Sequence, residues 1–87
     1  MYKIIFNDEK LLNKDFSKIS NKYLNNIFVK LNDLSKNWLD NSQVKKLTNY
    51  YLCDYKLRVW DYRIIFNLDI SNNEIVIFRI LHRSKLY

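Results

Sequence analysis

The C-terminal third of the chain alternates between apolar and charged residues. In residues 55–59 the apolar side chains occupy every second position, and Lys56 and Arg58 lie between them. The same two-residue period returns in residues 62–70 and 76–83. Such a period is typical of strands that bury one face. We therefore expect a three-stranded meander with one apolar face and one arginine-bearing face.

Two earlier segments show the three- and four-residue spacing of amphipathic helices. The first begins after a capping residue, Asn7 or Asp8, and ends before a break at residues 20–22. Asp15 on this helix is expected at the surface, paired with Lys18. The second helix is defined by an apolar stripe made of Leu24, Ile27, Leu31, Leu34 and Trp38.

A short alternating segment, residues 2–7, predicts a strand ahead of both helices. Residues 40–43 read as a polar connection, and residues 44–51 lead from it into the meander. Together these elements predict a single α+β domain over residues 1–87 with the order β-α-α-β-β-β. A helical hairpin should pack on one face of an antiparallel sheet. The place of the first strand in that sheet stays open.

Loop length decides which arginines face each other in the first hairpin of the meander. A two-residue loop at Trp60 and Asp61 places Arg58 directly opposite Arg63. Like charges in that arrangement destabilise a sheet, so the pair indicates that an anion binds there.

The second hairpin admits a loop of two residues (72–73) or of three (72–74). We favour the longer loop because it keeps the bulkier apolar residues together, and because Asn tolerates the left-handed conformation that it needs. It places Arg83 opposite Arg63, so that Arg58, Arg63 and Arg83 form one row across three strands. It also puts four residues of the last strand on the apolar side: Val76, Phe78, Ile80 and His82.

Composition narrows the function classes. The 87 residues include no Gly and no Pro, which excludes nucleotide-binding folds built on a glycine-rich phosphate loop. The single cysteine, Cys53, excludes an intrachain disulfide and a cysteine metal cluster, and we interpret it as a packing residue in a reducing cytosol. Neither a secretory leader nor the roughly 20 apolar residues of a membrane span is visible, so a soluble cytoplasmic protein is expected.

The formal net charge of +6 points to a polyanionic partner. All four arginines fall within the meander, at positions 58, 63, 79 and 83. A guanidinium group binds phosphate through a planar fork and keeps its proton at neutral pH. The arginines are therefore interpreted either as a phosphate-binding face or as solvated side chains on an exposed sheet.

Three stretches, YKLRVWDYRIIF (55–66), EIVIFRIL (74–81) and HRSKLY (82–87), occur in this order and spacing. They resemble the RelE/ParE toxin superfamily, specifically the RelE-type mRNA interferases, and the resemblance covers essentially the whole chain. It implies a toxin of a type II toxin–antitoxin system with a cognate antitoxin partner, no cofactor and no metal. It also implies cleavage of mRNA in the ribosomal A site, by attack of a 2′-hydroxyl on the adjacent phosphate to leave a 2′,3′-cyclic phosphate.

Carried over by position, the resemblance assigns the catalytic residues as Lys56, Arg63, Arg83 and Tyr87. The two arginines would stabilise negative charge that develops on the phosphate. Lys56 and Tyr87 would transfer the protons, and which of them is the acid stays open. Tyr87 has the alternative interpretation of an aromatic residue that covers the end of the sheet.

The predicted RNA contacts are Arg58, Lys45, Lys46, Trp60, Arg79 and His82. Several have a structural alternative. The two adjacent lysines are otherwise simply solvated, and His82 falls in the apolar row, which suggests a structural or tautomer-fixed residue. Trp60 stands where relatives commonly have Gly or another small residue, and it either stacks on a base or folds back over the sheet.

Two other functions stay open on the same fold. A ParE-like toxin would inhibit DNA gyrase through protein contacts, and such relatives generally lack the Lys, Arg and Tyr set. A non-catalytic RNA-binding module would use the arginine face for phosphate contacts alone. In a toxin–antitoxin pair, the antitoxin should be acidic where it covers the arginine face.

Overall fold

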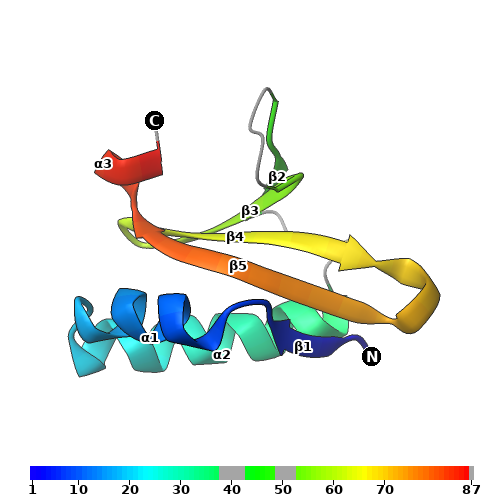
Figure 1. Ribbon diagram of the computed structural model, residues 1–87, viewed down its shortest axis with the longest axis horizontal. Coiled ribbons are helices and arrows are strands. Elements are labelled where there is room, and N and C mark those ends of the chain that lie inside the picture. The colour runs from blue at the N-terminus through cyan, green and yellow to red at the C-terminus, as the bar shows by residue number, and fades with distance from the viewer. Residues whose placement is uncertain (38–42, 49–52, 87) are drawn as a thin grey trace.

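The computed structural model describes residues 1–37, 43–48 and 53–86. Figure 1 shows α1 and α2 together on one side of a curved sheet, with the short helix α3 raised on the other side. The elements in chain order are β1 (Lys3–Phe6), α1 (Glu9–Ser17), α2 (Asn21–Asn37), β2 (Val44–Lys46), β3 (Tyr55–Val59), β4 (Tyr62–Asp69), a 3-10 turn (Ile70–Asn72), β5 (Glu74–His82) and α3 (Arg83–Leu86).

The sheet has five strands in the order β1-β5-β4-β3-β2. The predicted α+β class and the meander of β3, β4 and β5 are confirmed. β1 pairs with β5 in parallel, with Ile4 opposite Ile75, which settles the place of the first strand. β2 is an added antiparallel edge strand next to β3, at the start of the residues that were expected only to lead into the meander.

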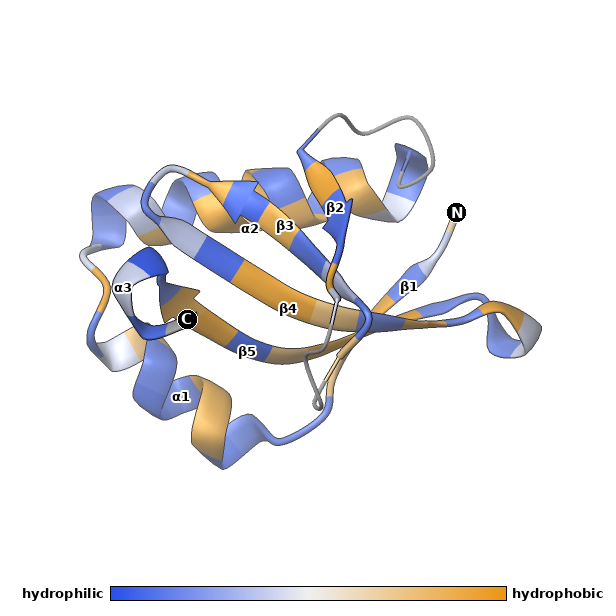
Figure 2. Cartoon of the chain, turned by 90° about the horizontal axis from the view of Figure 1, so that it is seen from above, coloured by the Kyte–Doolittle hydropathy of each residue, from blue (hydrophilic) through white to orange (hydrophobic). Residues whose placement is uncertain are grey.

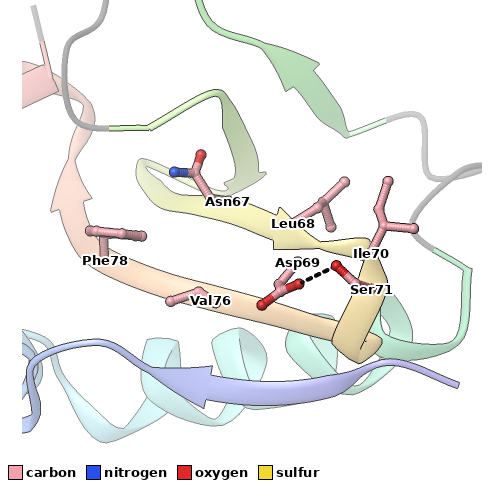
Figure 3. Close-up of a pocket in the computed structure, with 7 residues that line it drawn as sticks. All are labelled: Asn67, Leu68, Asp69, Ile70, Ser71, Val76 and Phe78. Atoms are coloured by element: carbon pink, nitrogen blue, oxygen red, sulfur yellow. Dashed lines mark hydrogen bonds between the residues drawn. The ribbon is translucent and has the colours of Figure 1, made fainter.

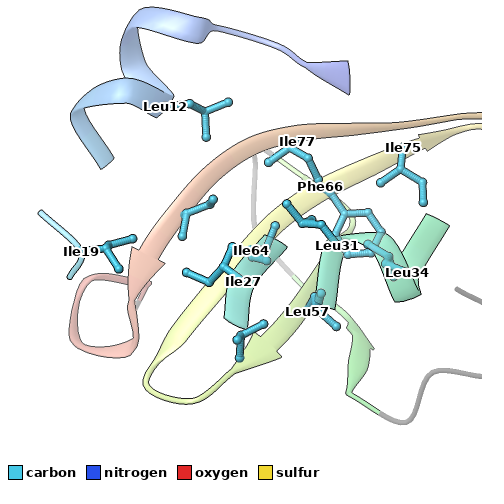
Figure 4. Close-up of a cluster of buried hydrophobic side chains, with 12 residues drawn as sticks. Leu12, Ile19, Ile27, Leu31, Leu34, Leu57, Ile64, Phe66, Ile75 and Ile77 are labelled. Atoms are coloured by element: carbon cyan, nitrogen blue, oxygen red, sulfur yellow. The ribbon is translucent and has the colours of Figure 1, made fainter. Parts of the chain in front are cut away.

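The apolar core lies between the helical pair and the sheet (Figure 4). α2 contributes Ile27, Leu31 and Leu34, which are all buried, as its three- and four-residue spacing predicted. Trp38, the last residue of the predicted stripe, lies outside the described residues. The side chains that the strands bury against these helices are Leu57, Val59, Ile64, Phe66, Ile75, Ile77 and Ile80. Each such side chain contributes about 1.5 to 3 kcal/mol when it leaves water.

Helix α1 begins at a side-chain cap. The Asp8 Oδ1 atom accepts a hydrogen bond from the Leu11 N–H at 3.1 Å, so the second of the two predicted caps is the one used. Such a cap satisfies a backbone donor that has no partner inside the helix. The helix then packs along β5, where its Leu12 is buried in the core.

The register between β4 and β5 differs from both predicted loops. The connection is the 3-10 turn plus Asn73, which adopts a left-handed conformation at φ 53°, and Asp69 lies opposite Glu74. A bulge at Ile65/Phe66 then leaves Phe78 without an opposite residue. The extra residue reverses the alternation, so Val76 and Phe78 point away from the helices, contrary to the prediction.

The end of β5 also differs from the prediction. Arg63 lies opposite Leu81, and Tyr62 lies opposite His82. Arg83 is not a strand residue, because the chain turns there into α3. The predicted row of three arginines across three strands is therefore wrong beyond its first pair. None of the helices among the described residues is long and apolar enough to cross a bilayer.

Candidate functional site

A cluster of cationic side chains lines one cavity on the sheet face opposite α1 and α2. The cavity has a volume of about 320 Å³ and is lined by Gln43, Lys45, Lys56, Arg58 and Arg63, a set that we call the basic pocket. Figure 2 looks onto this face and shows hydrophilic and hydrophobic bands in turn along β3. Leu57, between Lys56 and Arg58, and Val59, after Arg58, point into the core, so the two cations point to the opposite face.

Strand pairing places like charges opposite each other in this pocket. Lys45 lies opposite Lys56, and Arg58 lies opposite Arg63, as the two-residue loop predicted for the first hairpin. Directly opposed cations repel one another, which disfavours the sheet locally. A bound anion would relieve that repulsion and would receive charge-assisted hydrogen bonds.

Arg63 is held in place by the hairpin loop beside it. Its Nη1 atom donates to the Trp60 and Tyr62 carbonyl oxygens, each at 2.9 Å. These bonds use one nitrogen of the guanidinium group, and no other side-chain hydrogen bond joins that group to the described residues. The Nε and Nη2 edge is therefore available to a ligand in a side chain whose position is already fixed.

Arg83 lies outside the basic pocket, at the start of α3. Its backbone N–H donates to the Asp61 carbonyl oxygen at 2.7 Å, and its Nε atom lies 3.6 Å from Asp61 Oδ1. Both side chains are more than half exposed, so this ion pair contributes little to stability. Tyr87, the other C-terminal residue that was predicted to be catalytic, lies outside the described residues.

Arg79 points toward α1 and forms a buried ion pair. Its Nε and Nη2 atoms donate to the Asp15 carboxylate, each at 2.8 Å. Asp15 also accepts the Ile80 N–H at 3.1 Å and is only 4% exposed. The expectation of a surface Asp15 paired with Lys18 is therefore wrong. Arg79 is tied to an internal carboxylate and does not line the basic pocket.

One family of proteins matches nearly the whole chain. Residues 9–87 match the family described as the ParE toxin of type II toxin–antitoxin systems, parDE. The chain belongs to this family. No curated protein sequence matches it.

Solved structures of RelE proteins have the same fold as this toxin. The archaeal RelE–RelB complex of Pyrococcus horikoshii matches with a TM-score of 0.76 at 18% identity, covering 97% of each chain. The toxin–antitoxin complex RelBE2 of Mycobacterium tuberculosis also reaches 0.76, at 24% identity over 94% of this chain and 98% of that one. The RelB–RelE complex of Methanococcus jannaschii gives 0.70 at 22% identity, over 95% and 94%. At these identities the likeness concerns the fold.

Two other predicted RNA contacts of the toxin lie away from the basic pocket. Lys46 lies opposite Tyr55 on the helix-facing side of β2, so the alternation separates it from Lys45. His82 stands edge-on to the Tyr62 ring at 5.6 Å. The Ser84 N–H donates to His82 Nδ1 at 3.2 Å, which leaves the proton of the neutral ring on Nε2. RNA contacts by Lys46, Arg79 and His82 stay predictions.

Trp60 and Cys53 of the toxin have contrasting surroundings. Trp60 is 59% exposed and has a φ of 57°, a value in the left-handed region that favours Gly. Cys53 is buried beside Ile65, as its interpretation as a packing residue predicted. Burial, with a smaller effect of the Asp54 charge, raises the pKa of the Cys53 thiol to about 12, so the thiol is unreactive at neutral pH.

A further cavity of about 460 Å³ lies at the opposite end of β4 and β5, beside the 3-10 turn (Figure 3). Its walls include Val76 and Phe78, which the bulge turned away from the core, and Asp69, whose carboxylate accepts a hydrogen bond from Ser71. None of its lining residues carries a positive charge. The basic pocket therefore suits an anionic ligand better than this cavity does.

Proposed function

We propose that this toxin is a metal-independent endoribonuclease that cleaves mRNA in the ribosomal A site and so inhibits translation. The observation that carries the proposal is the basic pocket, where Lys45, Lys56, Arg58 and Arg63 surround one cavity on the open face of the sheet. An RNA phosphodiester carries a negative charge and has oxygen atoms that accept hydrogen bonds from lysine and arginine side chains, so it suits such a pocket. Because its substrate would be mRNA on ribosomes, the toxin would act in the cytoplasm.

Arg63 would bind the scissile phosphate. Attack of the 2′-hydroxyl on phosphorus increases the negative charge on the non-bridging oxygens, and a guanidinium group fixed in advance stabilises that charge without reorganising. The two carbonyl oxygens that hold the Arg63 Nη1 atom provide this fixation. Arg58, directly opposite, would contribute a second guanidinium group to the same phosphate.

The reaction also needs two proton transfers, which the proposal assigns to Lys56 and Tyr87. The 2′-hydroxyl loses a proton as its oxygen bonds to phosphorus, and the 5′-oxygen gains one as the P–O bond breaks. The products are a 2′,3′-cyclic phosphate and a 5′-hydroxyl. Lys56 lines the basic pocket, which supports its part in this step. Arg83 would approach the phosphate from the start of α3, beside Asp61.

The proposed partner is an antitoxin with an acidic segment. The similar proteins from P. horikoshii and M. jannaschii were solved as complexes of RelE with RelB. For this toxin, the cations of the basic pocket would be complementary to carboxylates, and two of them, Lys45 and Arg58, are exposed. An antitoxin that covers the pocket would exclude RNA and so neutralise the toxin.

One observation favours a second function, inhibition of DNA gyrase by protein contacts. The family model that matches residues 9–87 is that of the ParE toxins. In that case the basic pocket would bind an acidic protein surface and no cleavage would follow. A non-catalytic RNA-binding module, the third function, would use the same pocket to bind phosphates without cleaving RNA.

Induced expression distinguishes these functions. The 5′ ends of cellular mRNA are mapped after induction, and plasmid supercoiling is measured in the same cultures. New 5′ ends at codon positions within translated messages are the result expected for the endoribonuclease. Intact messages together with relaxed plasmid would support gyrase inhibition instead. Intact messages with normal supercoiling would support the non-catalytic RNA-binding module.

A further inference from the structure

A second cavity adjoins the basic pocket around the edge of β3. It has a volume of about 430 Å³ and is lined by Lys30, Gln43, Arg58, Val59 and Trp60, a set that we call the Trp60 site. Gln43 and Arg58 line both cavities. The two cavities therefore share a wall, and cationic side chains extend from Arg63 through Arg58 to Lys30 on α2.

Trp60 is an unusual residue for its position. Its φ of 57° disfavours any residue with a Cβ atom by about 1 to 2 kcal/mol, and the residue is 59% exposed. The indole meets the Tyr23 ring at a centroid distance of 5.9 Å and an interplanar angle of 67°. Tyr23 in turn contacts the Tyr62 ring at 5.9 Å. These contacts hold the indole in place in a residue that is more than half exposed.

We propose that the Trp60 site binds the nucleotide next to the scissile phosphate. Its base would stack on the exposed indole of Trp60, and its phosphate would lie between Arg58 and Lys30. This inference rests on the proposed endoribonuclease function and extends it from a phosphate pocket to a site for two consecutive nucleotides. Stacking requires an unpaired base, so the substrate class is single-stranded RNA.

The site should add affinity with little base preference, because every base offers a face to the indole. Stacking of one base on an aromatic side chain changes affinity by about fivefold or more. Lys30 should contribute one phosphate contact, which lowers the slope of log affinity against log salt by about 0.7 for a single strand.

The test measures binding of a fluorescein-labelled 2′-O-methyl tetranucleotide to the purified toxin by fluorescence anisotropy. The methyl groups block the attacking hydroxyls, so the RNA stays intact during the titration. Trp60→Gly is the main variant because Gly adopts a φ of 57° without strain, and Trp60→Phe keeps a stacking face. Lys30→Gln tests the same site from α2, and Lys36→Gln, on the last turn of that helix, is its control.

Support for the Trp60 site requires three results. Trp60→Gly should weaken binding of the tetranucleotide at least about fivefold, and Trp60→Phe should weaken it less. Lys30→Gln should reduce the salt slope while Lys36→Gln leaves it unchanged. With a tetranucleotide that lacks its bases, the toxin and Trp60→Gly should bind equally, because only the phosphates remain.

Three other results would overturn the inference. If Arg63→Ala weakens binding but Trp60→Gly and Lys30→Gln do not, the basic pocket binds RNA and the Trp60 site does not. If the unaltered toxin does not bind the tetranucleotide, the inference fails, and cleavage of a message on ribosomes decides the proposed function separately. If Trp60→Gly retains full RNA affinity but no longer co-purifies with a co-expressed antitoxin, the site is a protein-docking surface.

Discussion

Asp15 of α1 and Arg79 of β5 lie 64 positions apart in the chain and form two parallel hydrogen bonds of 2.8 Å. The same carboxylate accepts the N–H of Ile80 at 3.1 Å. β1 pairs with β5 only as far as Ile77, so the N–H of Ile80 has no strand partner on that edge. The Asp15 carboxylate takes the place of one. The contact joins the helical layer to the half of β5 that follows the bulge and leads into α3.

Replacing Asp15 by Asn should destabilise the fold strongly. The variant leaves the Arg79 guanidinium without its anionic partner in a largely buried place, and breaking such a pair costs about 3 kcal/mol. Urea unfolding followed by circular dichroism measures the change. Asp33→Asn, at an exposed position on α2, is the matched control and should change the free energy of unfolding by less than about 0.5 kcal/mol. Equal stabilities of the two variants would show that the ion pair contributes nothing.

The loop between β4 and β5 should depend on the left-handed residue Asn73. With φ 53° and ψ 47°, this position tolerates Asn and Gly better than Ala. We expect Asn73→Ala to lower the free energy of unfolding by about 1 kcal/mol and Asn73→Gly to leave it nearly unchanged. Thermal unfolding of the two variants side by side gives the comparison. A loss of stability that is larger for Gly than for Ala would contradict the assigned turn.

The Cys53 thiol should react slowly in the folded toxin. Burial raises its pKa from 9.0 to about 12, so the thiolate that attacks a disulfide reagent is scarce at pH 8. Labelling with dithionitrobenzoate at that pH should be slow in buffer and rapid in guanidinium chloride. Fast labelling of the native toxin would contradict the burial of this side chain.

The same pKa shift predicts a loss of stability in alkali. The unfolded chain releases the Cys53 proton near pH 9.0 and the folded chain near pH 12, so the unfolded state binds fewer protons in between. Stability from this group is therefore complete below about pH 9 and declines as the pH rises toward 12. Cys53→Ala should flatten that decline when unfolding is measured across this range. An unchanged decline in the variant would assign it to other groups.

Arg63 should require its guanidinium group as well as its charge. Lys at this position keeps the charge but cannot bond both loop carbonyls and also offer a planar fork to phosphate. If the toxin is an endoribonuclease, Arg63→Ala should reduce cleavage by about 10² to 10³-fold, and Arg63→Lys should restore little of it. Growth arrest after induction and circular dichroism of the purified variants are the two readouts. Full arrest by a folded Arg63→Ala variant would remove this residue from the mechanism.

The sequence predicted the helices, the meander and the Arg58–Arg63 pair because each depends on local periodicity or on a loop of two residues. It misplaced Val76 and Phe78 because a two-residue period does not show where a strand contains an extra residue. Asp15 was missed because its partner lies 64 positions away and its neighbours in sequence read as a solvated helix face. Arg83 was misplaced because of the same extra residue in β5, and because a helix of only four residues, α3, shows little periodicity.

The central claim is that the basic pocket serves RNA cleavage, and the most direct measurement is cleavage of a defined message by the purified toxin with purified translating ribosomes. The 3′ ends of the fragments are assayed for a 2′,3′-cyclic phosphate, with the toxin and Arg63→Ala compared at equal concentration. We predict cyclic phosphate ends at A-site codons with the toxin and almost none with the variant. An intact message, or equal cleavage by both proteins, would contradict the account.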